Sequence, residues 1–259
     1  MSDLDGLAAA FAQLASHAGL VVMDVYATDF DVRRKADLSP VSEADEAAEA
    51  LLVPGVEKLL PGVPILAEEA VSREGLVAIG SEFVLIDPLD GTKEFVSRNG
   101  EFTVNIALVR DGAPVAGCVY APALDRMYIG GTTGATGIVR PGEDVGELAP
   151  MTTRPYPEEL VAVASRSHAD AETAAFLADL GVVSTRSAGS SLKFCLVAEG
   201  SADVYPRFGP TMEWDTAAGD AVLRAAGGTV TNPDGTLFAY AKPGARNGSF
   251  VAWGREALR

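Results

Sequence analysis

The 259 residues of this chain can bury a large core as one big domain or as two tightly joined halves, and 48% apolar with 22% charged residues is ordinary for a globular protein. Lys and Arg total 20 against 36 Asp and Glu, which gives a formal net charge of −16. Such a surface repels polyanions, which argues against nucleic-acid polymers and anionic membranes as partners but leaves a small anionic substrate open if bound metal ions reverse the local field.

The N-terminal segment predicts neither export nor membrane insertion. The first five residues lack the positive region and apolar run of an export signal, and the apolar run at 19–24 is too short to span a bilayer. Cys118 and Cys195 are too few and too far apart to suggest a metal cluster, so we expect buried, reduced thiols. These features predict a cytoplasmic protein without stable membrane association.

Two helices are predicted in the first sixty residues. Residues 3–27 carry apolar side chains at helical spacing. Ser42 then has the position of an N-cap, and Asp45, three residues on, completes a capping-box spacing. The second helix, residues 43–60, is expected to be interrupted at Pro54, because proline removes an amide donor from the helix interior.

Strands follow, and then strands alternate with helices. Asp111-Gly112 between two alternating runs is a strong hairpin signal, and the Gly-, Thr- and Pro-rich segment 131–156 is the expected seam between halves. The predicted strands are 63–67, 83–86, 102–109, 114–120, 126–130, 160–164, 182–186 and 202–205, and the later helices are 169–180, 190–200 and 216–226. We therefore predict an α+β fold in one domain, 1–259, with an α+β subdomain at about 1–150 and an α/β subdomain at about 151–259.

Acidic residues gather where predicted strands end. Asp87 and Asp90 follow the apolar run 83–86, with Pro88 and Gly91 breaking the strand there, and Glu68 follows the run 63–67. Oxygen ligands collected at strand ends are what a hard cation such as Mg²⁺ needs. The alternative is a surface turn in which the Asp side chains only accept hydrogen bonds from local amides.

Other acids have simple structural alternatives when each is taken alone. Asp215 lies where the last predicted helix begins and could be an N-cap, Glu68 could be an exposed loop acid, and Asp45 could only cap its helix. Their presence in a fixed order around Asp-Pro-Leu-Asp-Gly-Thr favours a joint site.

That ordered set resembles the lithium-sensitive, magnesium-dependent phosphomonoesterases of the inositol monophosphatase superfamily over nearly the whole chain. The motifs are Asp37-x-Ser39-Pro40-Val41-Ser42-x-Ala44-Asp45, Glu68-Glu69, Asp87-Pro88-Leu89-Asp90-Gly91-Thr92 and Trp214-Asp215-x-Ala217. Within the superfamily, the segments 93–107, 190–200 and 205–211 resemble the 3′(2′),5′-bisphosphate nucleotidase (CysQ-type) branch. The resemblance implies a layered α/β/α/β/α sandwich and a place in sulfur assimilation.

The resemblance also implies roles for individual residues. Metal ligands would be Glu68, Asp87, the carbonyl of Leu89, Asp90 and Asp215, holding two Mg²⁺ ions and allowing a third with substrate, while Li⁺ and Ca²⁺ would inhibit. Asp45, Glu68 and Thr92 would be catalytic by orienting a metal-activated water and accepting its proton. Substrate would contact Glu68, Leu89, Asp90, Gly91, Thr92, Lys193, Arg207 and Asp215.

The residues beyond the acidic motif bear on the choice of phosphate ester. Arg207 stands where inositol-specific relatives have Glu, and a guanidinium suits a second phosphate better than a neutral polyol. Lys193 would add positive charge, and Tyr205, Phe208 and Trp214 are candidates for an adenine-stacking wall. Arg207 could instead form a structural salt bridge, Lys193 could lie on a solvated helix face, and the aromatic residues could be core.

The predicted reaction is Mg-dependent hydrolysis of the 3′-phosphate of adenosine 3′,5′-bisphosphate to AMP and phosphate. The alternatives are an inositol monophosphatase, a sugar bisphosphatase, or a non-enzymatic protein that keeps the fold. The last is disfavoured because all six motif residues (Asp45, Glu68, Asp87, Asp90, Thr92 and Asp215) are intact. The protein is expected to be a monomer or homodimer.

Overall fold

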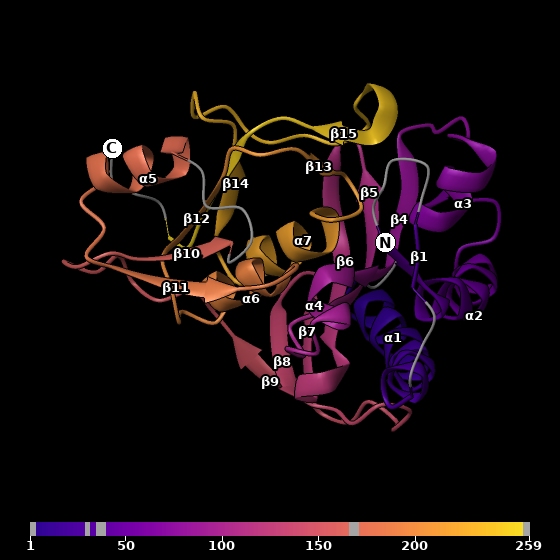
Figure 1. The fold of residues 1–259 in the computed structure, drawn as a ribbon. Coiled ribbons are helices and arrows are strands. Elements are labelled where there is room, and N and C mark those ends of the chain that lie inside the picture. The colour runs from indigo at the N-terminus through magenta and orange to yellow at the C-terminus, as the bar shows by residue number, and fades with distance from the viewer. Residues whose placement is uncertain (1–3, 29–31, 35–39, 166–170, 256–259) are drawn as a thin grey trace.

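Five layers of helices and sheets build the molecule (Figure 1). The computed structural model describes residues 4–28, 32–34, 40–165 and 171–255. Two helices cover one face of a seven-stranded sheet, two more lie between it and a five-stranded sheet, and a fifth covers the far side. The predicted α+β class and the α/β/α/β/α sandwich are confirmed.

The seven-stranded sheet carries the acidic motif. Its strand order is β3-β4-β5-β6-β7-β8-β9, with β3 parallel to β4 and every other pair antiparallel. Asp111 and Gly112 both have positive φ, 50° and 76°, as a tight primed hairpin turn requires. The strands are β3 Ile65–Ala67, β4 Glu82–Asp90, β5 Thr103–Arg110, β6 Ala113–Ala121, β7 Arg126–Gly130, β8 Gly134–Ile138 and β9 Ala149–Met151.

The outer face of this sheet is covered by α1 (Leu4–Tyr26) and α2 (Glu43–Leu59). By length and mean hydropathy, 1.5, α1 is the one described helix that would fit a membrane span. Of that apolar window, 44% is buried inside the protein, where α1 packs on α2 and β6. The prediction that the apolar run is too short to span a bilayer is therefore wrong, and the length of α1 does not exclude a membrane span.

The predicted break in the second helix is wrong. Pro54 lies inside a continuous α2, exposed on its solvent face, while Leu52 and Val56 on either side are fully buried. Burial of these flanking side chains outweighs the cost of a proline inside a helix, which is about 3 kcal/mol. Gly55 allows the close approach of α1, since a Cβ there would lie 2.6 Å from Leu14 Cδ2.

Before α2, a two-stranded ribbon joins β1 (Val32–Arg34) to β2 (Pro40–Ser42). Residues 35–39 and the capping side chain predicted for Ser42 fall outside what the structure describes. Two short helices follow strands of the large sheet: α3 (Glu68–Glu74) after β3 and α4 (Thr92–Val96) after β4.

The second sheet has the order β11-β10-β12-β16-β14. β10 is parallel to β11 and β12, as the alternating pattern predicts, whereas β16 pairs antiparallel with β12 and β14. The large apolar core lies between the sheets around α6 and α7, and α5 packs on the outer face. The bounds are β10 Val161–Ser165, α5 Ala171–Asp179, β11 Ser184–Ala188, α6 Leu192–Ala198, β12 Val204–Arg207, β13 Thr211–Met212, α7 Ala217–Ala225, β14 Thr229–Thr231, β15 Arg246–Asn247 and β16 Phe250–Trp253.

The predicted seam at 131–156 is not a plain linker. It contains β8 and β9, which complete the first sheet, and α7 from the second part of the chain packs on β5, β6 and β7. The division into subdomains at about residue 150 therefore stays a prediction, although the first sheet ends at Met151.

Candidate active site

A bulge in β4 brings two carboxylates to one pocket. Asp87 pairs with Asn105 and Asp90 pairs with Thr103, so three steps along β4 match two along β5. Residues three apart in a regular strand point to opposite faces, and the extra residue of a bulge corrects this. Pro88 has no amide to give to the ladder, which suits it to the bulge. The strand thus runs on to Asp90, beyond the predicted end at 86, and both acids line the same pocket.

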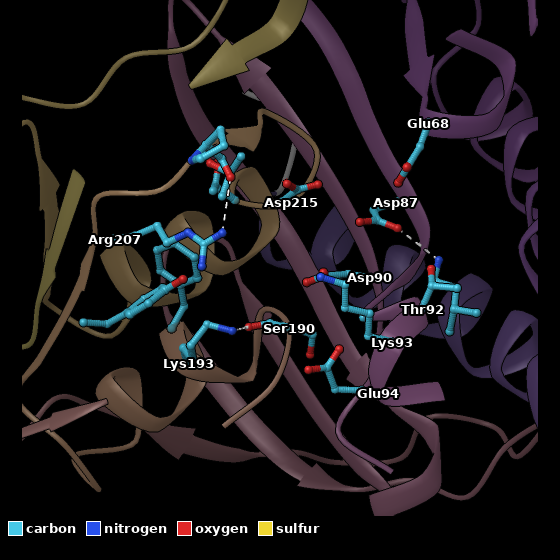
Figure 2. Close-up of a pocket in the computed structure, with 17 residues that line it drawn as sticks. Glu68, Asp87, Asp90, Thr92, Lys93, Glu94, Ser190, Lys193, Arg207 and Asp215 are labelled. Atoms are coloured by element: carbon cyan, nitrogen blue, oxygen red, sulfur yellow. Dashed lines mark hydrogen bonds between the residues drawn. The ribbon is translucent and has the colours of Figure 1, made fainter. Parts of the chain in front are cut away.

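Three carboxylates from separate elements form a cluster that could hold a metal ion. Glu68 at the start of α3, Asp87 on β4 and Asp215 before α7 each offer an oxygen, and these oxygens lie within 4.8 Å of one another. Figure 2 shows Glu68 and Asp87 pointing toward each other, with Asp215 beside them. Residues far apart in the sequence are therefore brought to one point, as the ordered motifs predict.

Burial and mutual repulsion govern the protonation of this cluster. Burial, followed by the charges of Glu68 and Asp90, raises the pKa of Asp87 well above its usual range. Asp215 has a raised pKa for the same reasons, with burial first and then Asp90 and Glu68. Carboxylates held together in this way favour a bound divalent cation, which removes their repulsion and supplies the oxygen-rich site that Mg²⁺ prefers. The donor set fits a hard metal ion.

Asp90 lies between the carboxylate cluster and a set of polar groups. Burial raises the pKa of Asp90 to about 6, against the opposing charge of Lys193. Asn105 Nδ2 donates to Asp90 Oδ2 at 3.4 Å and to Ser191 Oγ at 3.1 Å. Asn105 is buried on β5, so it ties the end of β4 to the start of α6.

The turn that carries Asp215 is held from three sides. Asp215 Oδ2 accepts a hydrogen bond from Met212 N at 2.8 Å, and Ser191 Oγ donates to its carbonyl oxygen at 2.8 Å. Asn247 Nδ2 donates to Met212 O at 2.7 Å. The N-cap of α7 is Thr216, so Asp215 does not cap that helix and its carboxylate is turned to the pocket.

The remaining motif residues lie around the acids. Leu89, Gly91 and Thr92 line the pocket, and the Leu89 amide donates to Asp87 Oδ1 at 3.1 Å. Gly91 has φ 94°, a left-handed conformation that suits glycine, and Thr92 opens α4. Asp45 is buried in the first turn of α2 and does not line the pocket wall, yet its charge helps to raise the pKa of Asp87.

The opposite wall of the pocket carries two cations (Figure 2). Lys193 on α6 is buried, not on a solvated helix face; it donates to Ser190 O and lies 5.4 Å from the Tyr205 ring centroid. Burial lowers the pKa of Lys193 to about 8, although Asp90 opposes this. Arg207 Nη2 donates to Pro210 O at 3.2 Å, while its buried Nε has no hydrogen-bond partner among the described residues. None of the salt bridges between described residues involves Arg207.

The pocket has a volume of about 310 Å³, within the range of small-molecule sites. Among the three aromatic candidates for a stacking wall, only Tyr205 lines it. Trp214 is buried in the core between the sheets, and the Phe208 ring packs 5.5 Å from Phe176. The core alternative therefore holds for Trp214, and Tyr205 is itself buried in the same core, whereas Phe208 is half-buried against Phe176.

Reasoning from the sequence missed several residues that complete the site. Asn105 and Ser191 link Asp90 to Asp215. Both belong to the segments 93–107 and 190–200 that resemble the nucleotidase branch, but the sequence alone assigns them no role. Ser190 and Glu94 line the pocket, and Ser190 has a left-handed φ of 45°. A serine at positive φ leaves no sequence signal, so only the fold could reveal it.

Comparison with known proteins shows the family of the chain. The model of the inositol monophosphatase family matches residues 3–257. The 3′(2′),5′-bisphosphate nucleotidase CysQ of Escherichia coli (strain K12) is 48% identical over 230 residues, which cover 88% of this chain and 91% of that protein.

Solved structures extend the likeness to the fold. CysQ from Bacteroides thetaiotaomicron superposes with a TM-score of 0.81 at 38% identity, covering 97% of this chain and 98% of its own. The Thermotoga maritima IMPase superposes with a TM-score of 0.75 at 25% identity, covering 98% and 92%. With its motifs placed around one acidic pocket, the chain belongs to the inositol monophosphatase family.

Proposed function

We propose that this protein is a phosphoric monoester hydrolase, a 3′(2′),5′-bisphosphate nucleotidase that converts adenosine 3′,5′-bisphosphate and water to AMP and phosphate. The observation that carries the proposal is the division of one pocket into a carboxylate side and a cationic side. A substrate with two phosphates can place one on each side. The likeness to CysQ nucleotidases supports the same reading.

The cationic side would bind the phosphate that is not cut. Arg207 lines the pocket and has a buried Nε without a hydrogen-bond partner among the described residues, and Lys193 lies on the same wall. Charge-assisted hydrogen bonds from these groups to a phosphate are each worth about 1.5–3 kcal/mol. Tyr205 offers the one aromatic ring of the three candidates that lines the pocket, so it could contact the nucleoside.

The carboxylate side would hold the metal ions and the phosphate that is cut. Glu68, Asp87, Asp90, Asp215 and the Leu89 carbonyl are the proposed ligands of two Mg²⁺ ions, with a third allowed when substrate binds. When bound, such ions polarise phosphoryl oxygens, lower the pKa of a water and stabilise the leaving oxygen. Li⁺ and Ca²⁺ are expected to inhibit, because they compete for the same oxygens with a different charge or coordination geometry.

The chain's own groups would orient the water and move its proton. Thr92 Oγ1 accepts the proton of the attacking water as its own hydroxyl proton passes to Asp45, and Glu68 orients that water from the metal side. The Gly91 and Thr92 amides, at the turn that opens α4, bind the phosphate oxygens. The 3′ oxygen leaves with the electron pair of the broken P–O bond and takes a proton from solvent.

A substrate panel tests the proposal. Phosphate release with Mg²⁺ is measured for adenosine 3′,5′-bisphosphate, inositol 1-phosphate and fructose 1,6-bisphosphate. We expect the highest kcat/KM for the nucleotide, and inhibition of its turnover by tens of millimolar LiCl. A kcat/KM that favours inositol 1-phosphate or the sugar bisphosphate overturns the substrate assignment.

The assembly and location of the enzyme are part of the proposal. We expect a cytoplasmic monomer or homodimer with no membrane partner, given the net charge of −16 and the packing of α1 into the core. Light scattering of the purified protein and sedimentation with anionic vesicles test this directly.

A further inference from the structure

The helix that presents Glu68 is too short to hold itself in place. α3 has seven residues, and isolated helices of this length do not form in water. Its N-cap residue is Ala67, which has no side chain able to cap the first amides. The position of Glu68 in the carboxylate cluster therefore depends on contacts from another part of the chain.

Glu49 on α2 supplies those contacts. Its side chain is buried, and Oε2 accepts hydrogen bonds from the amides of Glu69 at 2.9 Å and Ala70 at 3.2 Å. Oε1 accepts from Arg73 Nη2 at 2.9 Å, in the last turn of the same helix. One carboxylate thus replaces the missing N-cap and also anchors the far end of α3.

Glu49 lies on the same helix, α2, as the proposed catalytic residue Asp45. Glu49 comes one helical turn after Asp45, so the two lie on the same face of α2, and both are buried. The charge of Asp45 helps to raise the pKa of Asp87, while Glu49 accepts a hydrogen bond from the helix that starts at Glu68. A continuous α2 therefore fixes the spacing between the two regions.

We propose that Glu49 is a positioning residue for the metal centre: it holds the N-terminus of α3 so that Glu68 reaches Asp87 and Asp215. The inference rests on the proposed metal role of Glu68. Glu49 itself contacts backbone amides and Arg73, and neither substrate nor metal. Its loss should weaken metal binding while leaving the cationic wall of the pocket unchanged.

The test measures metal binding without substrate. Mn²⁺ affinity is determined by electron paramagnetic resonance for wild type, Glu49→Gln and Glu49→Ala, together with KM for adenosine 3′,5′-bisphosphate at saturating Mg²⁺. We expect Glu49→Gln to weaken Mn²⁺ binding by about 10-fold, and Glu49→Ala by up to about 100-fold, as for groups that orient metal ligands. KM for the nucleotide stays within about 2-fold.

Asp203 provides a matched control. Its side chain is another buried carboxylate, which accepts one hydrogen bond from the Val161 amide and two from the Arg154 guanidinium. It does not line the pocket. Asp203→Asn should lower the melting temperature in EDTA yet keep Mn²⁺ affinity. Arg73→Met, which removes the ion pair from a half-exposed arginine, should change affinity less than about 2-fold.

The outcomes separate this inference from the proposed function. Wild-type Mn²⁺ affinity in Glu49→Gln, beside weakened binding in Glu68→Gln, overturns the positioning role alone. Equal weakening in Asp203→Asn also overturns it, since the effect would then be general destabilisation. Unchanged Mn²⁺ binding in Glu68→Gln overturns the proposed metal site itself. If Glu49→Ala does not fold, the isosteric Gln variant, which keeps one accepting oxygen, carries the test.

Discussion

Individual residues in this pocket are fixed by local irregularities of the backbone. The bulge at Pro88 turns Asp87 and Asp90 to the same side, and Gly91 at φ 94° leads straight into α4. The motif predicted which acids would meet, but not that the strand would continue through them. That difference arises because a bulge keeps strand pairing on both sides of the proline.

Replacing Asp90 tests the acidic side at the residue scale. Asp90→Asn keeps the size of the side chain and its acceptor for Asn105, but removes the charge. We expect kcat to fall by at least about 100-fold, because the variant loses the charge of a proposed metal ligand. KM for the nucleotide should change much less. Steady-state phosphate release measures both constants.

Asp234→Asn, in an exposed turn outside the pocket, is the control and should retain full activity. Unchanged turnover in Asp90→Asn would mean that the metal assignment is wrong.

At the scale of elements, the ligands depend on contacts that a linear pattern cannot display. Glu213 is fully buried and accepts hydrogen bonds from the amides of Ala241 and Lys242, at 3.2 and 2.9 Å. Ala241 has φ 70°, so its positive φ lets two successive amides converge on one carboxylate, an anion-binding nest. This contact fastens the turn before Asp215 to the strap at 241–247, which the sequence left unassigned.

Breaking this contact should cost stability. Lys242 Nζ lies 3.5 Å from Glu213 Oε1 and over the Phe238 ring. Glu213→Gln leaves this partly buried cation with neutral acceptors only, Ala239 O and Asn247 Oδ1. We expect a loss of about 2–4 kcal/mol in the free energy of unfolding, measured by urea denaturation.

The double variant Glu213→Gln/Lys242→Met provides the internal check. Its loss should be clearly smaller than the sum of the two single losses, because each single change already breaks the pair. Strictly additive losses would show that the two side chains are not coupled.

Most helices and strands were predictable from the sequence, but the continuity of α2 and two short strands were not. Amphipathic spacing located α1, and Asp111-Gly112 located the hairpin between β5 and β6. Pro54 predicted a break that buried neighbours prevented, and β14 and β16 went unpredicted because they are short strands among loops. Local propensity fails where tertiary burial decides.

For the whole molecule, the carboxylate cluster makes stability depend on pH and metal. Burial raises the pKa of Asp90 to about 6 and also raises the pKa values of Asp87 and Asp215. A carboxyl whose pKa is higher in the folded state stabilises the fold when protonated, and that contribution is lost as pH rises through its folded pKa. Metal-free protein should therefore lose stability between pH 5 and 7.5.

Calorimetry in EDTA should record this as a fall of several degrees in Tm over that interval. The fall should be smaller in Asp90→Asn and should largely disappear with excess Mg²⁺, which binds only the folded state. Lys193, with its pKa lowered to about 8, would act in the opposite direction only above that pH. A metal-free Tm that rises from pH 5 to 7.5 would contradict the burial of repelling carboxylates.

The division of the pocket into an acidic and a cationic side was only partly predictable. The acids follow from four ordered motifs, whereas Lys193 looked equally suited to a solvated helix face until its burial was seen. Asn105 and Ser191, which tie Asp90 to Asp215, come from a strand and a helix that are brought together only by the fold.

The central claim is that one phosphate is cut at the carboxylates while a second is bound by Lys193 and Arg207. The most direct measurement is the ratio of kcat/KM for adenosine 3′,5′-bisphosphate to that for adenosine 3′-monophosphate, which differ only in the second phosphate. Two charge-assisted contacts predict a preference of at least about 100-fold for the bisphosphate, falling to about 10-fold or less in Arg207→Met. Equal kcat/KM values for the two nucleotides in the wild-type protein would contradict the claim.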